Sequence, residues 1–136
     1  MAIDRDRIAA AVREILVAIG ENPSRDGLRE TPVRVADAMA ELYAGVGADA
    51  TAGLSDSAST ADVVSNDPVI VRDLAFRSMC EHHLLPFHGV AHIAYEPTDI
   101  VVGLGRLARV LETISARPQV QERIGLEICD ALTAGA

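Results

Sequence analysis

Four consecutive residues of this sequence, Cys80, Glu81, His82 and His83, supply a thiol, a carboxylate and two imidazoles. Cys80 and His83 are three residues apart, a spacing at which a turn can direct a sulfur and a ring nitrogen toward one ion. Zinc binds this mixture of ligands readily. His82 projects differently from His83, so it can face a substrate as an acid or base while its neighbour binds metal. The cluster predicts a zinc site; the alternative is a core cysteine beside surface histidines.

Two arginines, Arg106 and Arg109, form a second candidate site. They lie three residues apart in a helical pattern that opens at Gly103-Leu104-Gly105, so they share one face of its first turns. The start of a helix offers unpaired amides, here those near Leu104 and Gly105, to an anion. Two guanidinium groups beside these amides would hold a polyphosphate well. The alternative is a pair of solvated arginines on an acidic protein.

Hydrophobic spacing predicts the elements that position these residues. Gly20 is expected to stop the first helix, and Thr31 is expected to cap the second, with proline at its first helical position. Gln121 and Glu122 fall in the first turn of the last helix, where a carboxylate also favours the helix dipole. The expected elements are helices at 8–19, 31–42, 104–114 and from Pro118 onward, and strands at 68–76, 88–95 and 100–102.

The Cys-His cluster is expected on the loop that joins the first two of these strands, because strand ends hold a loop rigidly. Residues from about 45 to 66 are mainly Ala, Ser, Thr, Asp and Gly, and they can bury little apolar surface. The predicted organisation is therefore an N-terminal helical segment at 1–47, a flexible loop at 48–67 and a core at 68–136.

Composition narrows the classes of partner. The 136 residues carry a formal charge of −8, and all 12 basic residues are arginine. An acidic surface argues against general binding to nucleic acid or to an anionic membrane, while a local arginine pocket for phosphate stays open. The sequence shows no apolar run of membrane-spanning length and no secretory leader. Its two distant cysteines suit a reducing cytoplasm, where ligand or core roles are commoner than a disulfide.

Taken together, the motifs of this chain resemble those of the GTP cyclohydrolase I family. Two of them are specific, Cys-Glu-His-His at 80–83 and Gln-Val-Gln-Glu-Arg at 119–123, and they occur here in the family's order. The remaining matches are Val71-Arg72-Asp73, the rest of 78–87, Gly89, Ala91-His92, Ala94-Tyr95, Val102-Gly103-Leu104, Leu107-Ala108-Arg109, Gly27-Leu28 and the segment 31–36.

The resemblance implies an α+β tunnelling fold (T-fold), in which an antiparallel sheet is backed by a pair of helices after an N-terminal helical segment. Several subunits would form a homo-oligomeric ring, with active sites at subunit contacts. The implied reaction is the zinc-dependent hydrolytic opening of the guanine ring of GTP. It yields formate and 7,8-dihydroneopterin triphosphate for folate and pterin biosynthesis.

The resemblance also implies roles for single residues in the metal and guanine sites. Cys80 and His83 correspond to two of three zinc ligands, and His82 corresponds to the histidine that transfers protons. Glu122 corresponds to the carboxylate that binds the N–H edge of guanine. Gln121 is its neighbour in the pocket and is counted with His82 among the catalytic candidates.

For the triphosphate, Arg109 corresponds to a binding arginine of the family. Arg106 stands where the family commonly has lysine, which preserves the positive charge. Gly105 replaces a common serine, so one hydroxyl contact is lost and the amide is kept. Leu104 belongs to the same segment at the start of the helix.

One departure concerns the end of the chain. In the family, two further strands follow the last helix; a His-x-Cys element there supplies the third zinc ligand and a second catalytic histidine, and these strands also supply another arginine. The sequence contains none of these residues, so the last hairpin of the T-fold is expected to be missing and the pure chain is expected to turn over little GTP. The alternative function is a catalytically incomplete T-fold subunit that binds a purine nucleotide or co-assembles with full-length subunits. A purely structural zinc site would need further ligands, with His88, His92 and Cys129 as candidates.

Overall fold

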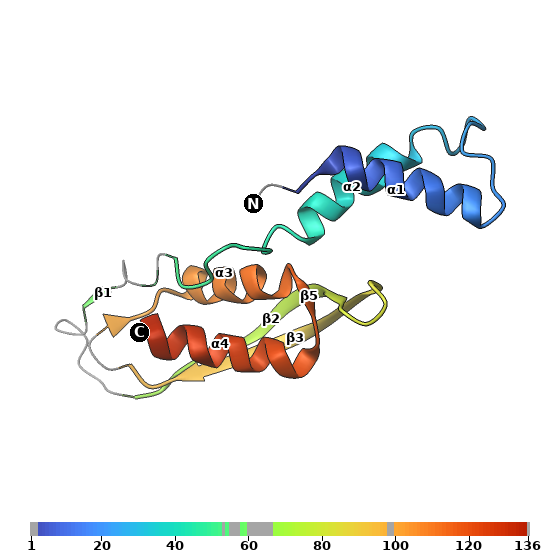
Figure 1. The fold of residues 1–136 in the computed structure, drawn as a ribbon. Helices are drawn as coiled ribbons and strands as arrows, with labels where there is room; N and C mark the ends of the chain where they lie inside the picture. Colours follow the sequence, from blue (N-terminus) through green and yellow to red (C-terminus); the bar gives the residue numbers. More distant parts are fainter. Residues whose placement is uncertain (1–2, 53, 55–57, 60–66, 98–99, 136) are drawn as a thin grey trace. The chain divides into compact units, whose positions relative to one another are not determined.

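The computed structural model describes residues 3–52, 54, 58–59, 67–97 and 100–135. The chain divides into two compact units, Met1–Ala44 and Gly45–Ala136. Figure 1 shows the helical first unit and the second unit, in which helices accompany a sheet. All residues proposed for chemistry lie in the second unit. The expected α+β class is confirmed by these elements.

The first unit consists of helices α1 (Arg5–Ala18) and α2 (Thr31–Leu42). Asp4 caps α1, because its carboxylate accepts the Arg7 N–H at 3.0 Å. Gly20 follows the end of α1 with a φ of 86°, a left-handed conformation that glycine adopts without steric cost. The predicted stop at this glycine is therefore confirmed.

The expected cap of α2 is wrong by one residue. Glu30 occupies the N-cap position and Thr31 is already helical, with no side-chain capping hydrogen bond. The reason is local, because the Thr31 N–H donates to the Leu28 carbonyl at 3.0 Å and continues the preceding turn into the helix. Pro32 still falls in the first turn, where its missing N–H leaves no helical hydrogen bond unmade.

A three-stranded sheet of order β3-β2-β5 forms the framework of the second unit. Strands β2 (Val69–Cys80) and β3 (Pro86–Tyr95) are antiparallel, and β5 (Pro118–Gln119) runs parallel to the end of β2. Two short strands, β1 (Ala58–Ser59) and β4 (Ile100–Val101), pair separately. Helices α3 (Leu104–Ser115) and α4 (Gln121–Gly135) pack on each other, and α3 contacts β2 (Figure 1).

The core of the second unit lies between this sheet and the two helices. Leu107 and Ile114 of α3 are fully buried, and Ile128 of α4 packs into the same cluster. On β3, Ile93 is buried while His88 and His92 are exposed, as strict alternation along the strand requires. The predicted strand at 88–95 is confirmed and forms most of β3.

Three expected boundaries are wrong, two beside the Cys-His cluster and one at the start of the last helix. Strand β2 continues to Cys80 and β3 begins at Pro86, so the connecting turn is only residues 81–85. Pro118 opens no helix; it belongs to β5, and α4 begins three residues later at Gln121. Backbone pairing explains these shifts, because Met79 pairs with Pro86 of β3, and Met79 and Cys80 pair with Pro118 and Gln119 of β5.

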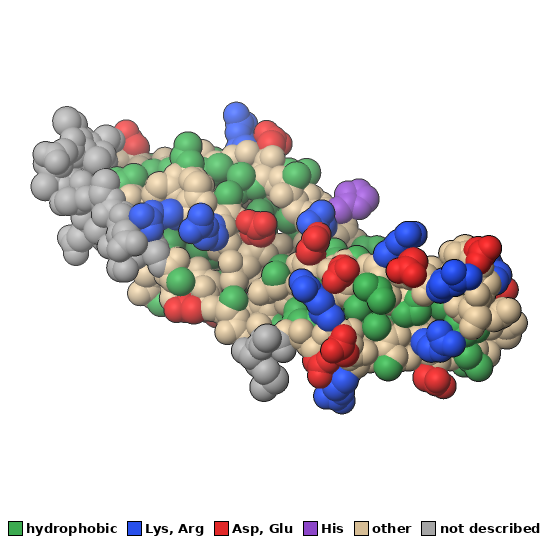
Figure 2. Space-filling view, turned by 90° about the horizontal axis from the view of Figure 1, so that it is seen from above, with side chains coloured by type: hydrophobic (Ala, Val, Ile, Leu, Met, Phe, Trp, Pro, Cys, Tyr) green, Lys and Arg blue, Asp and Glu red, His purple; other side chains and the backbone are tan. Residues whose placement is uncertain are grey.

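The predicted flexible loop at 48–67 lies in large part outside the described residues. Within its described part, Leu54 is buried in the core and the short strand β1 pairs with β4. Among the described residues, no helix has the length and apolarity that a bilayer crossing requires. On the face drawn in Figure 2, acidic and basic side chains are interspersed.

Candidate functional site

The turn that carries the histidines is closed by backbone hydrogen bonds at both of its ends. The Cys80 N–H donates to the Leu85 carbonyl at 2.9 Å, and the Leu84 N–H donates to the Cys80 carbonyl at 2.8 Å. Leu84 adopts a φ of 55°, which lets the chain reverse within residues 81–85 at the cost of a left-handed conformation. The exposed side chains of His82 and His83 therefore project from a turn of defined backbone shape.

The two histidines of the turn make different contacts. His82 Nδ1 lies 3.8 Å from the sulfur of Cys80. Ligands at zinc–sulfur and zinc–nitrogen distances of about 2.3 and 2.0 Å are roughly 3.5 Å apart at a tetrahedral ion, so this separation fits a shared metal. His83 Nδ1 instead accepts the Leu85 N–H at 3.2 Å. The structure thus brings Cys80 next to His82, and it engages one ring nitrogen of His83 with the backbone.

Glu81 is not free to act as a metal ligand, because Arg123 holds its carboxylate. The Arg123 Nη1 donates to Glu81 Oε2, and Nη2 donates to Oε1 at 3.0 Å, a bidentate pair. The Arg123 guanidinium lowers the pKa of the Glu81 carboxyl, and this carboxylate in turn raises the pKa of Arg123. Within the described part of the chain, no group of three or more His, Cys, Asp and Glu side chains comes together as a metal site.

Strand β5 brings the second motif to the same end of the sheet. Cys80 pairs with Gln119, and the Glu81 N–H donates to the Gln119 carbonyl at 3.1 Å. Gln121 and Glu122 follow directly, in the first turn of α4, and their side chains are exposed. Figure 1 shows the start of α4 close to the β2 end that leads into the turn. The residues predicted for metal, proton transfer and guanine therefore gather at one end of the second unit.

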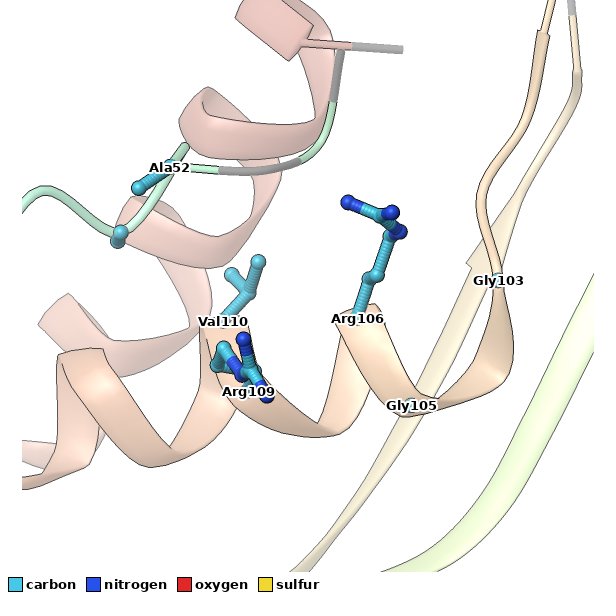
Figure 3. A pocket seen from close by; sticks show the side chains of 7 residues that line it. Ala52, Gly103, Gly105, Arg106, Arg109 and Val110 are labelled. Carbon is cyan, nitrogen blue, oxygen red and sulfur yellow. The ribbon is translucent and has the colours of Figure 1, made fainter. Parts of the chain in front are cut away.

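The two arginines predicted to bind phosphate line a separate pocket of about 490 Å³ near the start of α3 (Figure 3). Gly103 caps the helix without a side-chain hydrogen bond, and its carbonyl accepts the Arg106 N–H at 2.8 Å. A Cβ atom at Gly105 would meet nothing within 4 Å, so the backbone there is open to a ligand. The lining residues are Ala50, Ala52, Gly103, Gly105, Arg106, Arg109 and Val110.

Within one chain, the structure does not bring this pocket to the Cys80 turn. Arg106 lies in the first turn of α3, whereas the residues that pair with Cys80 follow the last turn of the same helix. A helix of 12 residues is about 18 Å long. Figure 1 shows the start of α3 and the β2–β3 turn at opposite ends of the unit. The candidate residues thus form two groups, one at each end of α3.

Three residues that hold the first group together, Glu81, Arg123 and Gln119, were not predicted as site residues. Gln119 is buried, and its side-chain amide donates to the Ile114 carbonyl at 3.3 Å and to the Glu127 carboxylate at 3.0 Å. A sequence signal existed, since all three belong to the two specific motifs at 80–83 and 119–123. The sequence does not indicate, however, that Arg123 pairs with Glu81 or that Gln119 binds Glu127.

Comparisons with known proteins agree with the motifs. The sequence model described as GTP cyclohydrolase I matches residues 8–136. A protein named GTP cyclohydrolase 1 from Leifsonia xyli is 57% identical over 133 residues, covering 98% of this chain and 69% of the relative. A protein of the same name from Streptococcus pneumoniae is 47% identical over 130 residues, covering 96% of this chain and 69% of the relative. The chain therefore belongs to the GTP cyclohydrolase I family.

Proposed function

We propose that this chain acts as a GTP cyclohydrolase I, an enzyme that opens the guanine ring of GTP by hydrolysis and yields 7,8-dihydroneopterin triphosphate and formate. The observation that carries the proposal is the meeting of the family's two specific motifs at one end of the second unit. Strand pairing between Cys80 and Gln119 places the histidine turn beside the first turn of α4. The product would enter folate and pterin biosynthesis.

In this proposal, Cys80 and His83 hold a zinc ion, whose chemistry is to lower the pKa of a bound water so that hydroxide is available near neutral pH. The donor set fits zinc in type, because it combines a thiol with an imidazole. His82, exposed and next to the sulfur, moves protons between this site and the purine. Glu122 accepts hydrogen bonds from the N–H edge of guanine, and Gln121 orients the base beside it.

Metal binding by His83 requires a change within the turn. With Nδ1 accepting the Leu85 N–H, a neutral imidazole carries its proton on Nε2, so neither nitrogen offers a free lone pair. Metal binding through Nδ1 would release the Leu85 N–H. Metal binding through Nε2 would place the ring proton on Nδ1, where it would face the Leu85 N–H. Either route breaks the hydrogen bond at 3.2 Å.

In this proposal the triphosphate binds in the pocket at the start of α3. Arg106 and Arg109 line this pocket, and the amides of Leu104 and Gly105 at the helix start would attract an anion. Because this pocket and the histidine turn lie at opposite ends of α3, one GTP would be shared by the base-binding end of one subunit and the phosphate-binding end of another. The proposed assembly is therefore a homo-oligomeric ring with sites at subunit contacts. Two free cysteines agree with a cytoplasmic location.

A second candidate function is a catalytically incomplete subunit that binds a purine nucleotide or assembles with full-length subunits. The observation that favours it is the donor count, since the described residues bring no third protein ligand to the Cys80 turn. Two ligands make a weak zinc site, because stable sites use three or four protein groups.

Incubation of the pure chain with zinc and GTP separates the two functions. Formate release and pterin fluorescence measure turnover, and calorimetry measures binding of GTP to the same preparation. For the pure chain alone we expect GTP to bind and little or no pterin to form, since its described residues bring no third protein ligand to the Cys80 turn. Robust pterin formation that is lost in Cys80→Ala would establish the complete enzyme and reject the incomplete subunit. Absence of GTP binding would reject both the enzyme and a nucleotide-binding subunit.

A further inference from the structure

The bidentate pair between Glu81 and Arg123 joins the turn at 81–85 to the first turn of α4. Glu81 stands between Cys80 and His82 in the turn, and Arg123 directly follows Glu122 in the first turn of α4. The two hydrogen bonds are formed by opposite corners of planar groups, so they fix the orientation of the two side chains as well as their separation. The turn and the helix are thereby coupled through side chains.

The backbone hydrogen bonds of the described residues do not join residues 82 and 83 directly to the first turn of α4. The bond from the Glu81 N–H to the Gln119 carbonyl holds the chain at residue 81, and the next backbone bonds of the turn involve Leu84 and Leu85. The exposed side chains of His82 and His83 lie between these anchors. On the other side, Val120 separates the strand residue Gln119 from the helix that carries Glu122. The ion pair spans this gap.

Because the pair is partly exposed to solvent, we do not expect its main role to be stabilisation of the fold. The Arg123 side chain is 42% exposed and the Glu81 side chain is 31% exposed. Solvent screens pairs of this exposure, and such pairs contribute little to the free energy of unfolding. The pair can still affect the geometry of the site, because residues that orient metal ligands influence metal affinity and activity without being ligands themselves.

We propose that Glu81 and Arg123 are positioning residues, which fix the metal-binding turn at 80–83 relative to the guanine-binding residues Gln121 and Glu122. The inference rests on the proposed function for the identity of the two ligands, metal and guanine. It goes beyond that function because it assigns a role to two residues that the proposed function places at neither the substrate nor the metal. Their effect passes through Cys80 and His83 on one side and through Glu122 on the other.

The test uses the full chain in a Cys129→Ser background, so that a cobalt–thiolate absorption band reports Cys80 alone. The variants are Glu81→Gln, Arg123→Gln and the charge exchange Glu81→Arg with Arg123→Glu. Glu21→Gln is the matched control, because it removes a carboxylate–arginine pair of similar exposure from the first unit. Cobalt affinity, GTP affinity, the melting temperature and amide hydrogen exchange at 80–85 and 119–124 are measured for each.

We expect each single variant to weaken cobalt binding by roughly 10–100-fold, the range found for partners that orient metal ligands. GTP affinity falls in the same variants, amide exchange rises in both segments, and the melting temperature stays near that of Glu21→Gln. The charge exchange restores part of the cobalt affinity. Unchanged cobalt affinity and unchanged exchange in the single variants would overturn the inference, and so would a parent chain that shows no cobalt–thiolate band.

Failure of the proposed function gives a different result. A parent chain that shows the cobalt–thiolate band but binds no GTP and forms no pterin would refute the function. The coupling between the turn and α4 would still be decided, because cobalt affinity and amide exchange do not depend on guanine chemistry. If the single variants lowered the melting temperature together with the cobalt affinity, and the charge exchange restored neither, the pair would be purely structural. That result would overturn the inference.

Discussion

At the scale of single residues, ligand binding beside the Cys80 turn and the start of α4 would depend on which side chains keep a free polar group. Glu81 and Glu122 are two exposed or half-exposed glutamates of the same region, but Arg123 occupies the carboxylate of Glu81. Glu122 lies one residue before Arg123 and makes no hydrogen bond or ion pair with the described residues. Its carboxylate is therefore available to a ligand with paired N–H donors, which the guanine edge presents.

Replacement of Glu122 by alanine is expected to lower GTP affinity by about 10–100-fold, because hydrogen bonds to a charged group contribute roughly 1.5–3 kcal/mol. Calorimetry measures the affinity, and metal analysis measures zinc content, which we expect to stay unchanged. Glu112→Ala serves as the control, since this glutamate is exposed on α3 and belongs to neither motif. Equal GTP affinity in Glu122→Ala and the parent would remove Glu122 from the site.

At the scale of elements, the segment that begins the second unit is packed closely onto the end of α3. The Gly45 N–H donates to the Ala116 carbonyl at 2.9 Å, and Arg117 donates to the carbonyls of Gly45 and Ala48 at 2.9 and 2.8 Å. A Cβ atom at Gly45 would lie 2.0 Å from the Thr113 carbonyl oxygen. Only glycine allows this approach, which fixes the position from which β5 departs.

Gly45→Ala is expected to destabilise the second unit by about 1–3 kcal/mol, because backbone must shift to admit the methyl group. Gly125→Ala is the matched control. Gly125 lies inside α4 and a Cβ atom there would meet nothing within 4 Å, so alanine should stabilise the helix by roughly 0.5–1 kcal/mol. Urea unfolding measures both. Stabilisation by both substitutions would show that the segment at Gly45 is not held against α3.

The elements also show what sequence can predict. Helices α2 and α3 were predicted within one residue at each end, and α1 begins three residues earlier than predicted, because spacing of apolar side chains reflects a buried face and not the helix cap. Strand β5 was missed, since Pro118 and Gln119 are stabilised by pairing with Met79 and Cys80, almost 40 residues away. For the same reason, no local pattern could reveal the pairing of Glu81 with Arg123. The roles of the site residues remain predictions.

At the scale of the whole molecule, the proposed function would require the two groups of candidate residues to come from more than one chain. The arginine pocket and the histidine turn are separated by the length of α3, about 18 Å for its 12 residues. If two copies contribute to each site, different copies of the chain can supply the two halves. Arg109 of one copy would then act with Glu122 of another.

Co-expression of Arg109→Ala with Glu122→Ala tests this arrangement. Random assembly of the two variants would leave about a quarter of the subunit contacts with both residues intact, and GTP binding should return at those contacts. Calorimetry gives the number of sites per chain, and each variant expressed alone is the control. A site built within one chain would gain nothing from mixing, so complete absence of binding in the mixture would contradict the shared site.

The hydrogen bond between His83 and the Leu85 amide gives the histidine turn a resting state of its own. If His83 binds zinc as proposed, the Leu85 amide would be released, so metal binding and a change of shape at residues 81–85 would be coupled. The Leu85 amide proton, protected before loading and exposed after it, would record the moment of capture.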